Sequence, residues 1–376
     1  MTEIFLIIFF ISVLLFFLGS GIWVAISMIG VSTIGMMLFT SRPVGDAMAT
    51  TIWGTSSSWT LTALPLFVWM GEILFRTKLS ENLFAGLSPW MQKLPGGLIH
   101  VNVVGCALFA AISGSSAATV ATVGKMSIPE LRKRKYPEKI LLGSLAGSGT
   151  LGLLIPPSII LIIYGVTVQE SIAKLFIAGI IPGIMIALIF MSYVMIWSLI
   201  NKKSMPKYVE NFSFLEKIRK SKQLLPVIIL ISAVIGSIYT GVATATEAAS
   251  LGVVGALILS YFQKSLTIET FKQSLLGATK TSCMIAFILA GSTFLSLAMG
   301  FTGLPRNLAI WIQNMELSPY VLIFVLMIFY IILGMFLDGI SAVVLTMAII
   351  EPMIRPVSYT HLRAHETPEH GVLRRV

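Results

Sequence analysis

Three polar segments interrupt hydrophobic stretches of this chain, and they hold the residues that could bind an ion or a small polar solute. The first spans residues 111–119, and its hydroxyl-bearing members are Ser113, Ser115, Ser116 and Thr119. These hydroxyls, with a backbone bent at Gly114, can offer oxygens to a desolvated cation, and free N–H groups at the start of a half-helix can bind a carboxylate. Close packing of small residues between membrane helices would explain the same composition, so both interpretations stay open.

The second segment, residues 147–158, has the sequence Gly-Ser-Gly-Thr-Leu-Gly-Leu-Leu-Ile-Pro-Pro-Ser. Gly149 and two further glycines around Thr150 loosen a helix. Pro156 and Pro157 remove two backbone donors, which frees the carbonyl groups that those donors would have paired. We therefore predict an unwound crossover at membrane depth, with a simple proline kink as the alternative.

The third segment begins at Asp338 and continues through Gly339 and Ser341 to Thr346. Asp338 is an ionisable side chain in an apolar setting, which favours a functional role. It could coordinate a cation, carry a proton or cap a half-helix.

The overall composition predicts a membrane protein. Of the 376 residues, 56% are hydrophobic and only 11% are Asp, Glu, Lys or Arg, whereas a soluble domain carries about 25% charged residues. The mean hydropathy is +0.92. Soluble enzymes, nucleic-acid-binding proteins and disordered scaffolds are therefore excluded, in spite of a net charge of +10. Apolar runs of about 20 residues suit membrane-crossing helices, and they predict an all-α polytopic protein with about ten segments in the lipid bilayer, some of them broken.

Local signals predict two helix boundaries. The first apolar run, residues 4–39, is too long for one span and contains Gly19-Ser20-Gly21, so we expect a two-helix hairpin. Further along, Thr244 or Thr246 is expected to cap a helix that carries Glu247 in its first turn.

Lysine and arginine gather in two clusters, at 125–139 and 202–222. Loops rich in these residues face the cytoplasm, and the two spans between the clusters place both on one side of the membrane. We therefore expect a basic cytoplasmic linker at 201–222. Binding of anionic lipids is the alternative role for these clusters.

Residue patterns recur at an offset of about 220. Phe67-Val-Trp-Met-Gly71 aligns with Phe287-Ile-Leu-Ala-Gly291, and the Ser113 segment aligns with Asp338-Gly-Ile-Ser-Ala342. We interpret residues 1–200 as a first repeat, with scaffold helices and a hairpin-and-crossover unit, and residues 223–355 as an incomplete second repeat. Repeated halves with sites near the midplane are typical of secondary transporters. The repeats are inverted if each half contains an odd number of spans.

The motifs of nucleotide-dependent and metal-dependent enzymes are absent from the sequence. It contains no G-x-x-x-x-G-K-[ST], no H-E-x-x-H and no C-x-x-C. Cys106 and Cys283 lie in apolar runs, where we expect small core residues. The sequence therefore argues against an enzyme.

Several motifs together resemble the large membrane subunit of tripartite ATP-independent periplasmic (TRAP) transporters. The likeness extends from about residue 4 to Arg355. The motifs that carry it are Pro65-Leu-Phe-Val-Trp-Met-Gly71, Ile112-Ser-Gly-Ser-Ser-Ala-Ala-Thr119, Gly152-Leu-Leu-Ile-Pro-Pro-Ser158, Leu175-Phe-Ile-Ala-Gly-Ile-Ile-Pro-Gly183 and Thr244-Ala-Thr-Glu-Ala-Ala249.

The resemblance implies a sodium-driven importer in a bacterial inner membrane, with Na⁺ as the coupling ion and no other cofactor. A periplasmic solute-binding protein would deliver an organic anion, such as a carboxylate or a sialic acid. The receiving complex would pair this subunit with a small four-helix membrane subunit. The implied fold belongs to the elevator-type ion transporters, in which a transport domain with helical hairpins and broken crossover helices slides against a scaffold.

The resemblance also implies which residues bind substrate and ions. Carried over motif by motif, they are Ser113, Gly114, Ser115, Ser116, Thr119, Gly149, Thr150, Pro156, Asp338, Gly339, Ser341 and Thr346. Among them, the implied sodium ligands are Ser113, Ser115, Gly149 and Thr150.

The end of the sequence departs from the family pattern. After Arg355 the composition becomes polar, with His361, His365 and His370 in a short stretch. We expect residues 356–376 to be a non-native tail on a C-terminally truncated permease, which leaves the second repeat without its own Pro-Pro crossover. A histidine metal site is the alternative explanation.

Two other functions stay open at this point. One is a stand-alone ion-coupled carboxylate transporter with a related repeat fold. The other is the membrane subunit of an ATP-driven importer, in which the segment 201–222 would contact an ATPase.

Overall fold

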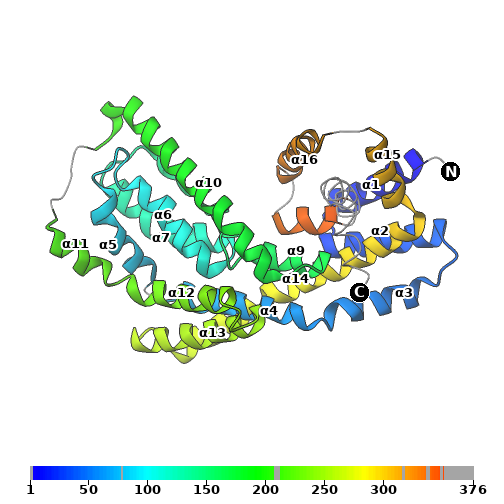
Figure 1. Ribbon diagram of the computed structural model, residues 1–376, viewed down its shortest axis with the longest axis horizontal. Coiled ribbons are helices and arrows are strands. Elements are labelled where there is room, and N and C mark those ends of the chain that lie inside the picture. Colours follow the sequence, from blue (N-terminus) through cyan, green and yellow to red (C-terminus); the bar gives the residue numbers. More distant parts are fainter. Residues whose placement is uncertain are drawn as a thin grey trace, which may run out of the picture. The chain divides into compact units, whose positions relative to one another are not determined.

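A computed structural model describes residues 3–77, 79–206, 212–315, 318–335, 339–347 and 350, and over these residues the protein is all-helical (Figure 1). The predicted all-α class is confirmed. The chain divides into two compact units, one built from Trp59–Cys283 and the other from the described residues before and after that range. Each unit is described separately below.

The larger unit contains both the Ser113 segment (residues 111–119) and the Pro156 segment (residues 147–158). Its elements are η1 (Trp59–Thr62), α4 (Ala63–Phe75), α5 (Leu79–Met91), α6 (Ile99–Ser113), α7 (Ser116–Lys133), α8 (Glu138–Gly149), η2 (Thr150–Leu153), α9 (Ile159–Val168), α10 (Ile172–Ile200), η3 (Lys202–Ser204), α11 (Phe214–Ser221), α12 (Leu225–Tyr239), α13 (Ala245–Phe262) and the first part of α14 (Ile268–Thr302).

The α6–α7 hairpin lies at the centre of this unit. Both hairpin helices pack against α8, and α6 also packs against α10 (Figure 1). Glycines permit these close approaches: a Cβ added at Gly124 of α7 would lie 2.8 Å from a Leu145 methyl group, and one added at Gly252 of α13 would lie 2.5 Å from the Met70 sulfur of α4. Small residues at helix interfaces are how membrane helices achieve close packing.

The smaller unit begins with the predicted two-helix hairpin. Its elements are α1 (Glu3–Gly19), α2 (Val24–Phe39), α3 (Val44–Ser56), the second part of α14, α15 (Leu304–Asn314), α16 (Pro319–Gly334) and a further helical stretch at 339–347. The turn between α1 and α2 uses Gly21 at φ +76°, a left-handed conformation that favours glycine. The hairpin predicted from Gly19-Ser20-Gly21 is therefore confirmed.

The helices are long and apolar enough for a protein that crosses a membrane several times. Among the described residues, α10, α13 and α14 each meet the length and hydropathy of a span, and two bent helix pairs raise the number to five. Five further apolar helices are shorter than a full span. In α10 the mean hydropathy reaches 2.5 while only 17% of the apolar window is buried, so this helix exposes an apolar surface that suits lipid.

The two cysteines differ from each other. Cys106 of α6 is fully buried, as predicted. Cys283 of α14 is exposed, so the prediction of a core residue is wrong at that position. An apolar neighbourhood in the sequence of a membrane protein does not distinguish a lipid-facing surface from a protein core, because both exclude water.

Candidate cation site at the tip of a helical hairpin

The Ser113 segment forms the tip of the α6–α7 hairpin. Gly114 ends α6 in a left-handed conformation at φ +58°, and its N–H donates to the Ala110 carbonyl oxygen. Ser115 is the N-cap of α7, and its hydroxyl accepts from the Ala118 N–H at 3.5 Å. Only two residues, Gly114 and Ser115, therefore separate the end of α6 from the beginning of α7.

The Ser113 and Thr119 hydroxyls form hydrogen bonds inside the hairpin tip. The Ser113 Oγ lies 2.9 Å from the Thr119 Oγ1, and both side chains are buried. The Ser115 carbonyl oxygen accepts from the Thr119 N–H at 3.0 Å, from the Thr119 hydroxyl at 2.7 Å and from the Ser113 hydroxyl at 3.3 Å. Ser116, by contrast, is half-buried, and none of these bonds involves its hydroxyl. The tip therefore brings together three oxygen atoms, those of the Ser113 and Thr119 hydroxyls and of the Ser115 carbonyl.

The predicted break in the helix is present, so the alternative of a simple proline kink is wrong, while its position at membrane depth stays a prediction. The helix α8 tightens into η2 at Thr150, and regular structure stops after Leu153 until α9 begins at Ile159. Pro156 and Pro157 lie in this gap, and the peptide bond between them is cis. Two helix ends therefore replace one continuous span.

The crossover contacts the hairpin tip through backbone atoms. The Ile159 N–H donates to the Gly114 carbonyl oxygen at 3.3 Å. A Cβ added at Gly114 would lie 2.8 Å from the Pro157 carbonyl oxygen, and one added at Gly152 would lie 2.7 Å from the Ser115 carbonyl group. The structure thus brings together the first two segments that the sequence singled out.

Gly149 and Thr150, two further predicted residues of the crossover, differ in their exposure to solvent. Gly149 is buried, and a Cβ there would overlap a methyl group of Val120 on α7. Thr150 is exposed, and its hydroxyl donates to the Gly147 carbonyl oxygen at 2.7 Å. Gly149 therefore allows α8 to approach the hairpin, whereas the Thr150 side chain faces outward.

The electrostatics of this region come from helix ends and not from charged side chains. Residues 111–119 and 147–158 include no Asp, Glu, Lys or Arg. The negative ends of α6 and η2 and the positive ends of α7 and α9 meet here, so the first pair favours a cation and the second an anion. A site whose oxygens are all neutral suits a monovalent cation, because nothing offsets the larger desolvation cost of a divalent ion.

The third predicted segment belongs to the smaller unit and is described in part. Asp338 lies outside the described residues. From Gly339 on, the described residues are helical, and Ser341 and Thr346 are buried there. The Thr346 hydroxyl lies 2.7 Å from the Tyr330 hydroxyl of α16, so α16 and this stretch contact each other.

Two residues at the hairpin tip were missed by the sequence reasoning. A Cβ at Gly71 of α4 would lie 3.0 Å from the Ser113 Cα, so Gly71 lets α4 contact the end of α6. The backbone N–H of Ile159 holds the tip carbonyl, as described above. Gly71 stands in a motif that the sequence analysis had noted, but nothing in a sequence shows which backbone N–H will reach a distant carbonyl.

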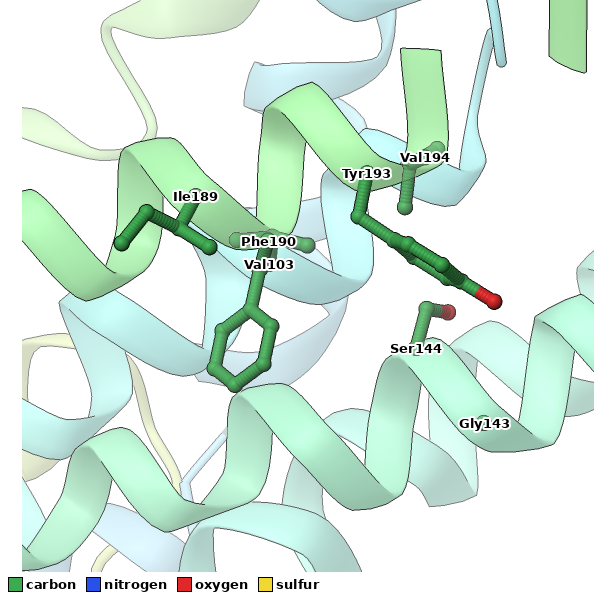
Figure 2. A pocket seen from close by; sticks show the side chains of 7 residues that line it. All are labelled: Val103, Gly143, Ser144, Ile189, Phe190, Tyr193 and Val194. Atoms are coloured by element: carbon green, nitrogen blue, oxygen red, sulfur yellow. The ribbon is translucent and has the colours of Figure 1, made fainter. Parts of the chain in front are cut away.

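A cavity elsewhere in the larger unit is not part of this site. It has a volume of about 300 Å³ and lies between α6, α8 and α10. Figure 2 shows Ile189, Phe190, Tyr193 and Val194 of α10 opposite Gly143 and Ser144 of α8. Its walls are mostly apolar side chains, which offer few ligands to an ion.

Comparisons with known proteins identify the family. A sequence model described as "Tripartite ATP-independent periplasmic transporter, DctM component" matches residues 10–365. The chain belongs to this family. The C4-dicarboxylate TRAP transporter large permease protein DctM of Pseudomonas aeruginosa is 32% identical over 86% of this chain and 74% of its own length. The corresponding protein of Rhodobacter capsulatus is 31% identical over 87% of this chain and 76% of its own length.

A third relative differs in its named solute. The sialic acid TRAP transporter large permease protein SiaM of Vibrio cholerae is 30% identical over 90% of this chain and 79% of its own length. This chain is therefore a TRAP large permease, a multi-pass membrane protein of a transporter family and not an enzyme. The family match ends at residue 365, ten residues beyond the boundary drawn at 355. The non-native origin of residues 356–376 stays a prediction.

Proposed function

We propose that this TRAP large permease is the ion-coupled subunit of a sodium-driven importer of organic anions in a bacterial inner membrane. The observation that carries the proposal is the contact between the hairpin tip and the crossover, where Gly114 meets Ile159 and Gly152 meets Ser115. Discontinuous helices that meet inside the protein are the usual construction of an ion site in a secondary transporter.

In this proposal sodium binds where carbonyl and hydroxyl oxygens converge. Ser113, Ser115, Gly149 and Thr150 are the proposed ligands, and Thr150 contributes its backbone, since its hydroxyl already donates to Gly147. The substrate carboxylate binds beside the tip, toward the positive end of α7. A second site at Asp338, Gly339, Ser341 and Thr346 belongs to the same proposal.

Coupling follows if sodium and substrate together stabilise the closed tip. A ligand drives a change of state only through its different affinity for the two states. Ion binding would order the tip against the crossover, and the occupied transport domain would then slide through the membrane as an elevator. The repeat at an offset of about 220 residues supports two such hairpin-and-crossover units.

The proposed partners and solutes come from the relatives. Two relatives are named for C4-dicarboxylates and one for sialic acid, which supports an organic anion as substrate here. A periplasmic binding protein and a small four-helix membrane subunit complete the proposed complex. The binding protein would select the solute.

The test is uptake in proteoliposomes that contain the chain and its small subunit, with the binding protein outside. Labelled C4-dicarboxylate and sialic acid are supplied with an inward sodium gradient, or with sodium replaced by potassium. We expect uptake of one solute that requires both sodium and the binding protein.

Uptake of equal rate in potassium would overturn the sodium coupling. Uptake without the binding protein would favour a stand-alone ion-coupled transporter. Uptake that requires internal or external ATP would favour the ATP-driven importer.

A further inference from the structure

The basic linker contains a short amphipathic helix that the proposed transport cycle does not use. Within residues 201–222, α11 spans Phe214–Ser221. The Ser213 N–H donates to the Glu216 carboxylate at 2.8 Å, which supplies the reciprocal cap that starts a helix in this polar stretch. The described part of this linker therefore contains a helix with its own N-terminal cap.

One face of α11 is apolar and open. Phe214, Leu215 and Ile218 expose 67%, 78% and 40% of their surface. Leu215 and Ile218 are three residues apart, so they lie on the same face of the helix. A short helix gains nothing from keeping three large apolar side chains in water, which indicates that something apolar covers this face.

The same face carries cations without carboxylate partners. Arg219 and Lys222 lie four and seven residues after Leu215, so they lie on the same side of the helix toward its C-terminal end, and both are exposed. In the described part of the chain, neither forms an ion pair, whereas Arg132 and Arg134 of the other basic cluster pair with Glu138 and Glu130. The charge beside α11 is therefore available to an external anion.

The helix is held in place by α5. The Trp90 indole N–H donates to the Ser221 hydroxyl at 2.8 Å, and the Trp90 ring meets the Phe214 ring edge to face at 6.3 Å. The Lys217 ammonium lies 5.3 Å from the centre of the Trp90 ring. Trp90 itself is 41% exposed, and tryptophan is enriched where protein meets the membrane–water interface.

The connection to α12 fixes the direction of α11. The two helices are bent by 55° at a short break. Leu224 in this break is buried against Gly86 of α5, where a Cβ would lie 2.6 Å from the Leu224 side chain. If the apolar helix α12 runs across the bilayer, α11 is turned away from that direction, toward the membrane plane, as interfacial helices are.

We propose that α11, with Trp90, binds anionic phospholipid at the cytoplasmic leaflet. Leu215 and Ile218 enter the acyl region, while Arg219 and Lys222 bind the phosphate of an anionic headgroup. The apolar face accounts for the insertion of α11 into the acyl region, and the unpaired cations account for a preference for anionic over zwitterionic lipid. A protein partner that covers α11 is the competing occupant.

The test places a fluorescent probe on the apolar face of the full chain in lipid nanodiscs. Leu215→Cys is labelled with bimane in a Cys283→Ser background, while buried Cys106 is left in place. The nanodiscs contain phosphatidylcholine and phosphatidylglycerol at 4:1. In one sample the phosphatidylglycerol is brominated and quenches the probe. In the other sample an equal mole fraction of the phosphatidylcholine is brominated instead.

We expect brominated phosphatidylglycerol to quench at least twofold more strongly than brominated phosphatidylcholine. High salt should reduce this preference, because screening weakens headgroup binding. Arg219→Gln/Lys222→Gln should abolish the preference. The matched control is Lys133→Gln/Lys139→Gln, which removes two exposed cations from the other basic cluster and should retain it.

Three results would overturn the proposal. Equal quenching by the two brominated lipids would show insertion without headgroup selection. Quenching by aqueous iodide and by neither lipid would place α11 in water, and protection from all quenchers only when the small subunit is present would assign α11 to that protein. Elution volume and thermal midpoint in detergent confirm that both double variants fold.

Discussion

Gly152 lies against the peptide unit of Ser115, so close that an added Cβ would stand 2.7 Å from both the carbonyl carbon and the carbonyl oxygen. Gly152 belongs to η2 and Ser115 to the hairpin tip. The contact is between two backbones, with no side chain that could move aside. The position of the tip therefore depends on a missing side chain in the crossover.

Gly152→Ala should separate the tip from the crossover. Overpacking a tight interior costs about 1–3 kcal/mol, so we expect a lower thermal midpoint in detergent and a loss of stabilisation by sodium. Gly143→Ala on α8 is the matched control, because nothing lies within 4 Å of its Cβ position. That control should leave the midpoint unchanged or raise it slightly. Equal effects of the two variants would contradict the close contact.

Ser115→Ala should weaken the apparent affinity for sodium. Loss of one hydroxyl at the tip is worth about 1–1.4 kcal/mol, which corresponds to a decrease of roughly 5–10-fold. The measurement is the sodium dependence of uptake. Ser171→Ala is the control, since Ser171 caps α10 with the same 3.5 Å bond that Ser115 makes at α7. An unchanged sodium dependence in Ser115→Ala would move the site elsewhere.

Tyr136→Phe should destabilise the protein, because it removes a hydrogen bond between the segment before α6 and the segment between α7 and α8. The buried Tyr136 hydroxyl accepts from the Leu98 N–H at 3.1 Å, and without it that N–H has no partner. The expected cost is about 1–3 kcal/mol, measured as a lower thermal midpoint. Tyr193→Phe on the exposed face of α10 is a suitable control. A midpoint that does not fall would show that water replaces the hydroxyl.

The same tyrosine predicts a pH effect. Burial raises the pKa of Tyr136, while the hydrogen bond from Leu98 and the charge of Arg134 lower it by less. A group whose pKa is raised by folding stabilises the fold below its unfolded pKa of about 10, and that contribution is lost as pH rises further. Wild type should therefore lose more stability than Tyr136→Phe as the pH rises above about 10. Parallel curves would contradict a buried phenol.

Thr244→Ala should weaken the start of α13. The Thr244 side chain accepts from the Glu247 N–H at 3.3 Å, and the Glu247 carboxylate accepts from the Thr244 N–H at 2.8 Å. Loss of such a cap costs about 1 kcal/mol. The thermal midpoint of Thr246→Ala should change less, because its hydroxyl does not cap the helix. A larger effect at Thr246 would reverse this assignment.

The all-helical fold class, the positions of the helix breaks and the polar segments could be predicted from the sequence, because they depend on residues close together in the chain. Glycine at 21 and 114 and proline at 156 and 157 interrupt helices for local steric reasons. The choice between Thr244 and Thr246 as cap depended on where the first turn of α13 begins, and composition could not decide it. The structure gives that role to Thr244.

The contacts that assemble the candidate site join distant residues. Nothing local to Gly114 predicts that its carbonyl will meet the N–H of Ile159, 45 positions later. Likewise, α11 lies in a run of basic residues whose charge suggested membrane orientation or binding of anionic lipids, but not an amphipathic helix. Its apolar face becomes visible once Leu215 and Ile218 are placed on one helix.

The Ser115 carbonyl oxygen already accepts three hydrogen bonds from Ser113 and Thr119. A cation that takes this oxygen must displace at least one hydroxyl, so ion binding at the tip is an exchange and not a simple addition. The displaced hydroxyl can then turn its own lone pairs toward the ion. The tip would then have two mutually exclusive arrangements, one held by hydrogen bonds and one by the bound cation. Its conformation would therefore depend on whether the ion site is occupied.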